Sequence, residues 1–425
     1  MWALRSLGML IASALIGGGL APGSSGAQAS SADQAALHYQ RLLERRPGDP
    51  RLWARLADAC IQKARATGDV GYFGRAEAAL RKALELDPRH GEAVRQLAFV
   101  LYSRHDFEGA AREARRALAL DPGDRHAYGV LGDALLEVGR YAEARETYAT
   151  MMRLGRDLYT LSRRAGLRSL TGDPEGAIDD LGRAIEAGRA SAEPPESLAW
   201  AEWQLGNEHF ALGRLGAAEA RYRAALATYP GYHRGAAGLA HVRAAQGRHA
   251  DAIELYRKAL DVVPLPEYAA ALGDLYARIG RRQEAEKQYA LVEYIGRLST
   301  LNQVLYNREL AYFYADHELN LAEALRLARR ELDVRQDVYA SDLLAWALLK
   351  NGRAADAVDP ITTALRLDTQ DAKLHFHAGL IYRALGQTEL ARAHLGRALA
   401  LNPHFHLLHA DTAARALQAL GEGRP

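Results

Sequence analysis

The phrase Ala83-Leu-Glu-Leu-Asp-Pro88 returns twice, as Ala117-Leu-Ala-Leu-Asp-Pro122 and as Ala398-Leu-Ala-Leu-Asn-Pro403. Pro88 and Pro122 are 34 residues apart, and the same interval separates Pro230 from Pro264. A fixed period of this kind is typical of proteins built from stacked structural repeats. The 425-residue chain is therefore expected to form a long repeat array rather than a set of unrelated domains.

Three further marks recur around these prolines. An Ala precedes a Tyr by four residues at Ala144/Tyr148, Ala218/Tyr222, Ala252/Tyr256 and Ala285/Tyr289. A Leu-Gly or Leu-Ala pair stands earlier in the repeat, at Leu131-Gly132, Leu205-Gly206, Leu239-Ala240, Leu272-Gly273, Leu310-Ala311 and Leu344-Ala345. A glycine falls at the turn that follows, at Gly139, Gly172, Gly213, Gly247, Gly280, Gly352 and Gly386. The spacing predicts two helices in each repeat, a helix A and a helix B, joined at this glycine.

Each mark has a physical role in such a helix pair. The small residue of the Leu-Gly pair lets helix B approach helix A closely, and the aromatic ring fills the gap between them. The turn glycine adopts the left-handed conformation that ends helix A at little steric cost. Proline ends helix B because it cannot continue the hydrogen-bond ladder. Since no pair buries its faces alone, stability is expected to come from stacked neighbours.

The pattern resembles the tetratricopeptide repeat family, in which W-x2-L-G-x2-Y, A-x3-F and P recur over 34 residues. The resemblance covers roughly residues 33–405 and implies an all-α fold, a right-handed α-solenoid of about ten helix pairs with a C-terminal cap helix. We expect the repeats near 50–90, 91–124, 125–157, 158–190, 199–232, 233–265, 266–299, 304–337, 338–371 and 372–405. A leading helix is expected over 33–46 and the cap helix over 406–421.

Departures from the pattern suggest how the array is organised. The first repeat carries about seven extra residues within 66–75, and Arg164-Ala165 replaces Leu-Gly in the fourth. Asp316–Asn320 stands in the eighth repeat where a turn glycine is expected. The proline-containing stretch after the fourth repeat predicts a bend. The expected domains are an N-terminal array over 30–190, a bend over 191–198, a C-terminal array over 199–405, and the cap helix with its tail over 406–425.

The first residues have the form of an export signal. A short charged start precedes the apolar segment Leu7–Leu20, and small residues follow at Ala27-Gln28-Ala29. This arrangement is typical of a cleaved secretory signal peptide over residues 1–29, with cleavage after Ala29 or Ala27. A retained anchor is the alternative. The segment predicts an exported protein, in the bacterial periplasm or cell envelope or secreted, with no membrane span left after cleavage.

Composition and motifs exclude several classes of function. The net charge of +2, from 54 basic and 52 acidic residues, is not the basic footprint of a nucleic-acid-binding protein. A single cysteine, Cys60, cannot form an intramolecular disulfide or a cysteine-built zinc site. The chain has no phosphate-binding loop, dinucleotide fingerprint or H-E-x-x-H motif. We therefore predict a protein that is not an enzyme and needs no cofactor.

The concave surface is the predicted functional surface. The family resemblance implies that helices A line it, so the residues on their inner faces are candidates for contact with a partner. These candidates are Arg95, Phe99, Tyr102, Asp133, Trp200, Trp203, Asn207, His241, Arg308, Tyr312, Trp346, Phe376 and Arg383. Aromatic residues beside arginines are typical of the hot spots of protein interfaces. The sequence thus predicts an exported scaffold that binds other proteins or peptides, of unknown identity and oligomeric state.

An alternative interpretation is that the chain binds a metal ion or an anionic glycan. Six of the 15 histidines lie near the C-terminus, at His375, His377, His394, His404, His406 and His409. Imidazole is a good ligand for zinc, copper and nickel, although residues two apart on a helix point in different directions. Five arginines within Arg153–Arg168 offer a face for an anionic polymer. We keep both as alternatives to protein binding, with packing and solvation as the simpler explanation.

Overall fold

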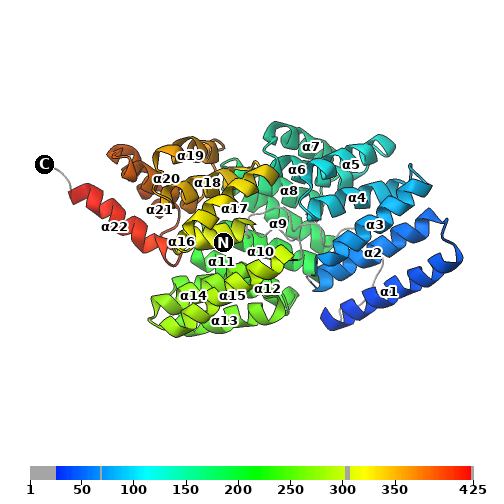
Figure 1. Ribbon diagram of the computed structural model, residues 1–425, viewed down its shortest axis with the longest axis horizontal. Coiled ribbons are helices and arrows are strands. Elements are labelled where there is room, and N and C mark those ends of the chain that lie inside the picture. The colour runs from blue at the N-terminus through cyan, green and yellow to red at the C-terminus, as the bar shows by residue number, and fades with distance from the viewer. Residues whose placement is uncertain (1–24, 68, 302–306, 423–425) are drawn as a thin grey trace. The chain divides into compact units, whose positions relative to one another are not determined.

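The computed structural model describes residues 25–67, 69–301 and 307–422, and within these ranges the regular structure is helical, with no strand (Figure 1). The first helices of the ten pairs are α2 (Pro50–Thr67), α4 (Gly91–Ser103), α6 (Arg125–Glu137), α8 (Leu158–Leu170), α10 (Pro195–Ala211), α12 (His233–Ala245), α14 (Pro266–Arg278), α16 (Asn307–Asp316), α18 (Val338–Lys350) and α20 (Ala372–Ala384). Their partners are α3 (Gly71–Leu86), α5 (Phe107–Leu120), α7 (Tyr141–Leu154), α9 (Pro174–Ala190), α11 (Leu215–Thr228), α13 (His249–Val262), α15 (Arg282–Leu301), α17 (Leu321–Val334), α19 (Val358–Leu365) and α21 (Thr388–Leu401). A leading helix, α1 (Ser25–Arg45), and a closing helix, α22 (His409–Glu422), complete the array. The predicted all-α repeat fold is confirmed.

The turn glycines adopt the left-handed conformation that the repeat requires. All seven that the sequence singled out have a positive φ, between 69° and 82°. In the second and eighth pairs, which lack the glycine, His105 and Glu318 take the same region with φ of 64° and 55°. The geometry of the turn is therefore kept even where a side chain makes it costly.

The prolines end the second helices as expected. Helix α3 ends at Leu86, two residues before Pro88, and α5 ends at Leu120, two residues before Pro122. The same offset separates the ends of α11, α13 and α21 from their prolines. Because proline restricts the residue before it to an extended conformation, the helix stops one residue earlier still.

A tyrosine fills the gap inside the helix pair. In the third pair, a Cβ added to Gly132 would lie 2.2 Å from the ring of Tyr148, so only glycine permits this approach. The Tyr148 hydroxyl donates a 2.5 Å hydrogen bond to Asp133, the residue after the glycine. The same contact joins Tyr222 to Asn207 at 2.8 Å. The repeat thus buries a large ring and also satisfies its hydroxyl.

Two repeats differ from the expected form. The extra residues of the first pair lengthen α2 to 18 residues instead of forming a long loop. In the ninth pair, α19 is only eight residues long and follows the short 3₁₀ turn η3 (Ala355–Ala357). Pro360 occupies the first turn of α19, where a missing backbone N–H costs little. The sequence pattern did not predict this shortened helix.

The chain divides into two compact units, and the first comprises the described residues up to Arg156. It contains α1–α7, stacked in chain order, with α2·α3, α4·α5 and α6·α7 as its pairs. Phe99 and Tyr102 on α4 and Val130 on α6 lie in its core, each at most 4% exposed.

The second unit begins at Asp157, and its last helix pairs contact earlier ones. We call this contact the return of the chain. The Thr369 hydroxyl donates to the carbonyl of Leu170 at 2.5 Å, and the Asn402 amide donates to the carbonyl of Phe210 at 2.7 Å. Arg278 likewise donates to the carbonyl of Leu407 at 2.7 Å. The ends of the ninth and tenth pairs therefore contact the turns of the fourth and fifth pairs. This return closes the inner side of α10, α12, α14 and α16 over part of its length.

The expected bend over 191–198 falls inside the second unit, as the turn between α9 and α10. Of the expected signal peptide, residues 1–24 lie outside the part of the chain that the structure describes. None of the described helices combines the length and the hydropathy needed to cross a bilayer.

Candidate functional site

The second unit holds a cavity of about 140 Å³ on the inner side of its first helices. One wall is formed by α12, α14 and α16, and the other by the segment 403–411 that the return brings across from the tenth pair. Phe210, Tyr312, Phe313 and Phe405 give the cavity an apolar lining. We call this cavity the inner pocket. It exists because residues about 90 to 200 positions apart in the sequence meet there.

Two carboxyl groups of the inner pocket differ from the others in having no ion-pair partner among the described residues. Glu267, on α14, and Glu309, on α16, both line it. Burial, followed by the nearby charges of Glu267 and Glu331, raises the pKa of Glu309 to about 7. Burial also raises the pKa of Glu267. Neither residue forms an ion pair with another described residue, so both carboxyls are available to a cationic ligand, and Glu309 adds negative charge to the wall as the pH rises through about 7.

The other acids of the inner pocket are already engaged. Asp274 lies 2.7 Å from Nε2 of His317, and Asp411 lies 2.9 Å from the guanidinium of Arg278. These pairs cross between helices and between repeats, and they hold the walls together. The acids of the inner pocket that lack such a pair are therefore Glu267 and Glu309.

The fifth acid of the inner pocket, Asp316, is the centre of a polar cluster at the end of α16. The indole nitrogen of Trp346 donates to its Oδ1 at 2.7 Å, and the ammonium of Lys373 donates to its Oδ2 at 3.1 Å. Nε2 of His409 lies 3.1 Å from Oδ1, and Nε2 of His406 lies 4.0 Å from Oδ2. Burial raises the pKa of Asp316, but Lys373 and the imidazoles outweigh it and hold that pKa well below its usual range.

The two imidazoles of this cluster have lowered pKa values. Burial lowers the pKa of His409 to about 3 and lowers the pKa of His406 well below its usual value. The cluster therefore combines a carboxyl group with a lowered pKa, two imidazoles with lowered pKa values and the amino group of Lys373. We call Asp316, His406 and His409 the Asp-His-His cluster.

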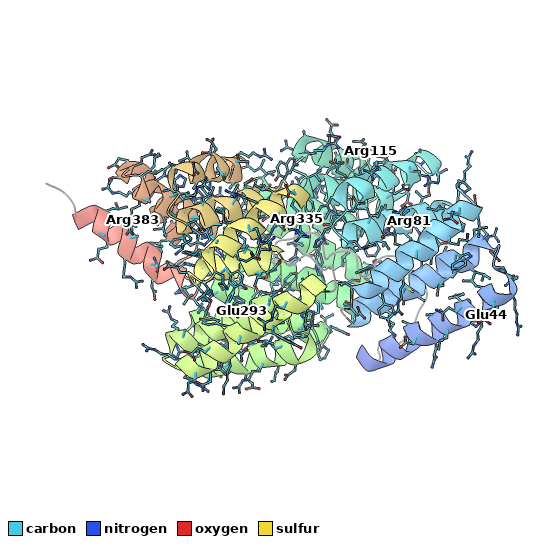
Figure 2. All side chains as sticks on the ribbon, in the orientation of Figure 1. Glu44, Arg81, Arg115, Glu293, Arg335 and Arg383 are labelled. Atoms are coloured by element: carbon cyan, nitrogen blue, oxygen red, sulfur yellow. The ribbon has the colours of Figure 1, made fainter. Side chains whose placement is uncertain are left out.

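The structure buries most of the candidate groove residues. Ten of the thirteen have side chains exposed by 9% or less: Phe99, Tyr102, Asp133, Trp200, Trp203, Asn207, Arg308, Tyr312, Trp346 and Phe376. Arg95 and His241 are half-buried, and Arg383 is exposed on α20, where Figure 2 labels it. Two of the thirteen, His241 and Tyr312, line the inner pocket.

The buried candidates pack between successive helices. Trp346 is fully buried and stacks on His377, with ring centroids 4.0 Å apart. Trp203 is 2% exposed, and the guanidinium of Arg234 lies 5.1 Å from its ring. Arg308 donates to Asp337 at 2.9 Å. Such side chains leave little surface for a partner in this conformation, and a role for them in binding remains a prediction.

Several arginines within Arg153–Arg168, the alternative site for an anionic polymer, already contact other residues of the chain. Arg163 is fully buried, with its guanidinium 3.7 Å from the centre of the Tyr159 ring. Arg164 donates to Asp180 at 2.7 Å, and Arg168 lies 3.4 Å from the same carboxylate. These arginines therefore have intramolecular partners that an anionic glycan would have to replace.

Sequence reasoning missed Glu267 and Glu309 as functional candidates. It grouped His406 with His409 but had no means of joining them to Asp316, which lies 90 residues before His406. The stretch Asp316–Asn320, which lacks the expected turn glycine, was the available signal. The repeat pattern does not encode the return of the chain, and this return is what brings the histidines to Asp316.

The raised pKa of Glu309 predicts that the variant Glu309→Gln is more stable than the parent chain at high pH. An acid whose folded pKa lies above its unfolded value of 4.5 loses stability as the pH rises through that interval, here up to about 7. Replacing it should gain about 1–3 kcal/mol at pH 8 and almost nothing at pH 4. Urea unfolding at both pH values measures the difference. An equal gain at both would contradict the raised pKa.

Comparisons with known proteins agree with the repeat architecture. Family models described as tetratricopeptide repeat match residues 57–90, 101–162, 203–270, 238–297 and 372–405. The chain is 30% identical over 270 residues to the cellulose synthase 2 operon protein C of Komagataeibacter xylinus. That alignment covers 63% of this chain but only 17% of the relative, so the chain spans a small part of that protein's length.

Solved structures with a similar fold have low sequence identity to the chain. A human IFIT1 dimer with m7Gppp-AAAA has a TM-score of 0.53 and 18% identity, over 80% of this chain and 77% of that one. Pseudomonas aeruginosa PilF has a TM-score of 0.41 and 19% identity, over 48% of this chain and 91% of that one. At these identities the first likeness shows the fold alone, and the second is too weak to support an argument.

Proposed function

The chain belongs to the tetratricopeptide repeat family, and from that premise we propose that it is a scaffold without catalytic activity that binds other proteins or peptides. We further propose that the inner pocket takes one basic side chain of the partner. The observation that supports this choice is the pair Glu267 and Glu309, which have no ion-pair partner among the described residues at the wall of an apolar cavity. A lysine or arginine stem fits the apolar lining, and its charged head meets the carboxyls.

The expected signal peptide supports a setting outside the cytoplasm. We propose that the scaffold acts in the periplasm or cell envelope, or after secretion, because residues 1–29 have the form of a secretory leader. The preformed helices limit the cost of ordering the binding surface, so a short segment of a partner can suffice.

Selection of a random-peptide phage library on the purified chain tests the proposal. We expect enrichment of peptides with a Lys or Arg flanked by apolar residues. The variant Glu267→Gln/Glu309→Gln should bind the selected peptide roughly tenfold more weakly or worse, because a hydrogen bond to a charged group contributes about 1.5–3 kcal/mol. Affinity for the parent chain should rise from pH 6 to pH 8, since ionised carboxyls bind the cation and the pKa of Glu309 is about 7.

The matched control is Glu254→Gln/Glu286→Gln, which removes the same charge from exposed sites on α13 and α15. It should leave peptide affinity unchanged. Selection of acidic or uncharged peptides would contradict the proposal, and so would equal loss of binding in the control and the test variant.

A further inference from the structure

The Asp-His-His cluster brings three potential metal ligands together from two parts of the chain. Asp316 is the last residue of α16, His406 precedes α22 and His409 is its first residue. One ligand atom from each side chain lies within 4.8 Å of the other two. The two imidazole rings are 4.3 Å apart between centroids. This spacing leaves a common point that all three groups can approach.

The nitrogen of His409 supplies a second, independent observation. His409 is 5% exposed, and its Nε2 has no hydrogen-bond partner among the described residues. It lies 3.1 Å from Oδ1 of Asp316, yet without the geometry of a hydrogen bond. A buried polar atom without a partner is unfavourable unless something else satisfies it.

We propose that Asp316, His406 and His409 bind a divalent transition-metal ion of the zinc class. Two imidazoles and one carboxylate are a ligand set that binds zinc and related ions and leaves further positions open. Asp316 and His406 also line the inner pocket, so the ion would be accessible from it. The site goes beyond peptide binding, because it needs no partner to form.

The surroundings orient the ligands. Trp346 donates to the carboxylate of Asp316 and fixes its direction, as outer hydrogen bonds do in metal sites. The ring of His409 packs against Phe376, with centroids 4.9 Å apart. For His406, binding through Nε2 requires a proton on Nδ1, which now accepts a 3.2 Å hydrogen bond from the amide of Leu408. Binding of the ion through Nε2 therefore breaks that hydrogen bond, at a cost that the metal–ligand bonds must exceed.

Lys373 gives the proposal its sharpest test. Its ammonium lies 3.1 Å from Oδ2 of Asp316 and supplies the positive charge that balances the carboxylate. A divalent ion at the cluster is repelled by this ammonium. Removing it in Lys373→Met should therefore tighten metal binding about tenfold, whereas a cluster that serves only as an internal ion pair would bind no metal in either form.

The experiment is calorimetric titration of the purified, untagged chain with Zn²⁺ in the absence of peptide, with Co²⁺ absorption as a second readout. We expect one ion per chain. Asp316→Asn, His409→Gln and His406→Gln should each weaken binding by roughly 10–100-fold, because each removes one of three ligands or its charge. The ligand-field bands of bound Co²⁺ should weaken in parallel.

The control is His375→Gln/His394→Gln, which removes another imidazole pair of the same unit, with Nδ1 atoms 3.0 Å apart. It should retain the parent affinity. Circular dichroism and thermal melting check that each variant folds, and His406→Gln decides the question if the two more buried variants do not. Absence of Zn²⁺ binding, or binding lost in the control and kept in His406→Gln, overturns the proposal.

Discussion

Replacing Trp346 by alanine is expected to cost the second unit about 3–5 kcal/mol of its free energy of unfolding, the range for truncating a buried aromatic residue. The side chain is fully buried, stacks on His377 at 4.0 Å and lies 5.7 Å from Phe376 between centroids. Its indole nitrogen also donates to Asp316, which would lose a partner. Chemical denaturation followed by circular dichroism measures the loss.

Trp53→Ala provides the matched comparison. Trp53 is half-buried, and its indole nitrogen donates to the carbonyl of Pro47 at 2.9 Å. We expect this change to cost clearly less than Trp346→Ala, since less apolar surface is lost. If Trp346→Ala cost no more than Trp53→Ala, Trp346 would be open to solvent, as the sequence pattern alone suggested.

The helix pairs could be predicted from the sequence because each requirement is local. A turn glycine, a small residue beside a tyrosine and a terminal proline all act within one repeat of 34 residues. The seven glycines that the pattern selected are also the seven glycines with positive φ among the described residues. Gly139 and Gly386 illustrate this, since the place of each between two helices is enough to predict its left-handed conformation.

The exposure of the concave residues could not be predicted in the same way. Whether Trp346 or Phe376 faces open solvent depends on how far the array winds before it meets itself. The hydrogen bond from Asn402 to Phe210 joins residues 192 positions apart, and no periodic mark encodes it. Small rotations accumulate from pair to pair, and together they decide whether the inner side is a groove or a closed cavity.

Asp133 and Asn207 also have a place in the packing of their repeats that could have been inferred from the sequence. A buried tyrosine hydroxyl needs a hydrogen-bond partner. Tyr148 and Tyr222 each find one 15 residues earlier, directly after the glycine that lets the ring approach. The polar residue of Leu-Gly-Asp and Leu-Gly-Asn is thus part of the packing unit.

The packing unit also predicts the effect of filling its glycine. Gly132→Ala should destabilise the first unit by about 1–3 kcal/mol, because the new Cβ would lie 2.2 Å from the ring of Tyr148. The ring is 1% exposed and its hydroxyl is bonded to Asp133, so it cannot move aside without losing that bond. Alanine is native at the equivalent place in the sixth pair, at Ala240 against Tyr256, which shows that the penalty depends on how closely the two helices approach. Denaturant unfolding at constant pH measures it.

The same substitution at Gly396 should have the opposite sign. Gly396 lies inside α21, and an added Cβ would meet nothing within 4 Å. Alanine there restricts the unfolded chain without a clash, so Gly396→Ala should gain about 0.5–1 kcal/mol. The pair of variants separates helix propensity from close packing, because propensity alone favours alanine at both positions. A gain in stability at Gly132 as well would mean that Tyr148 yields readily and that the Leu-Gly mark reflects turn formation rather than the approach of helix B.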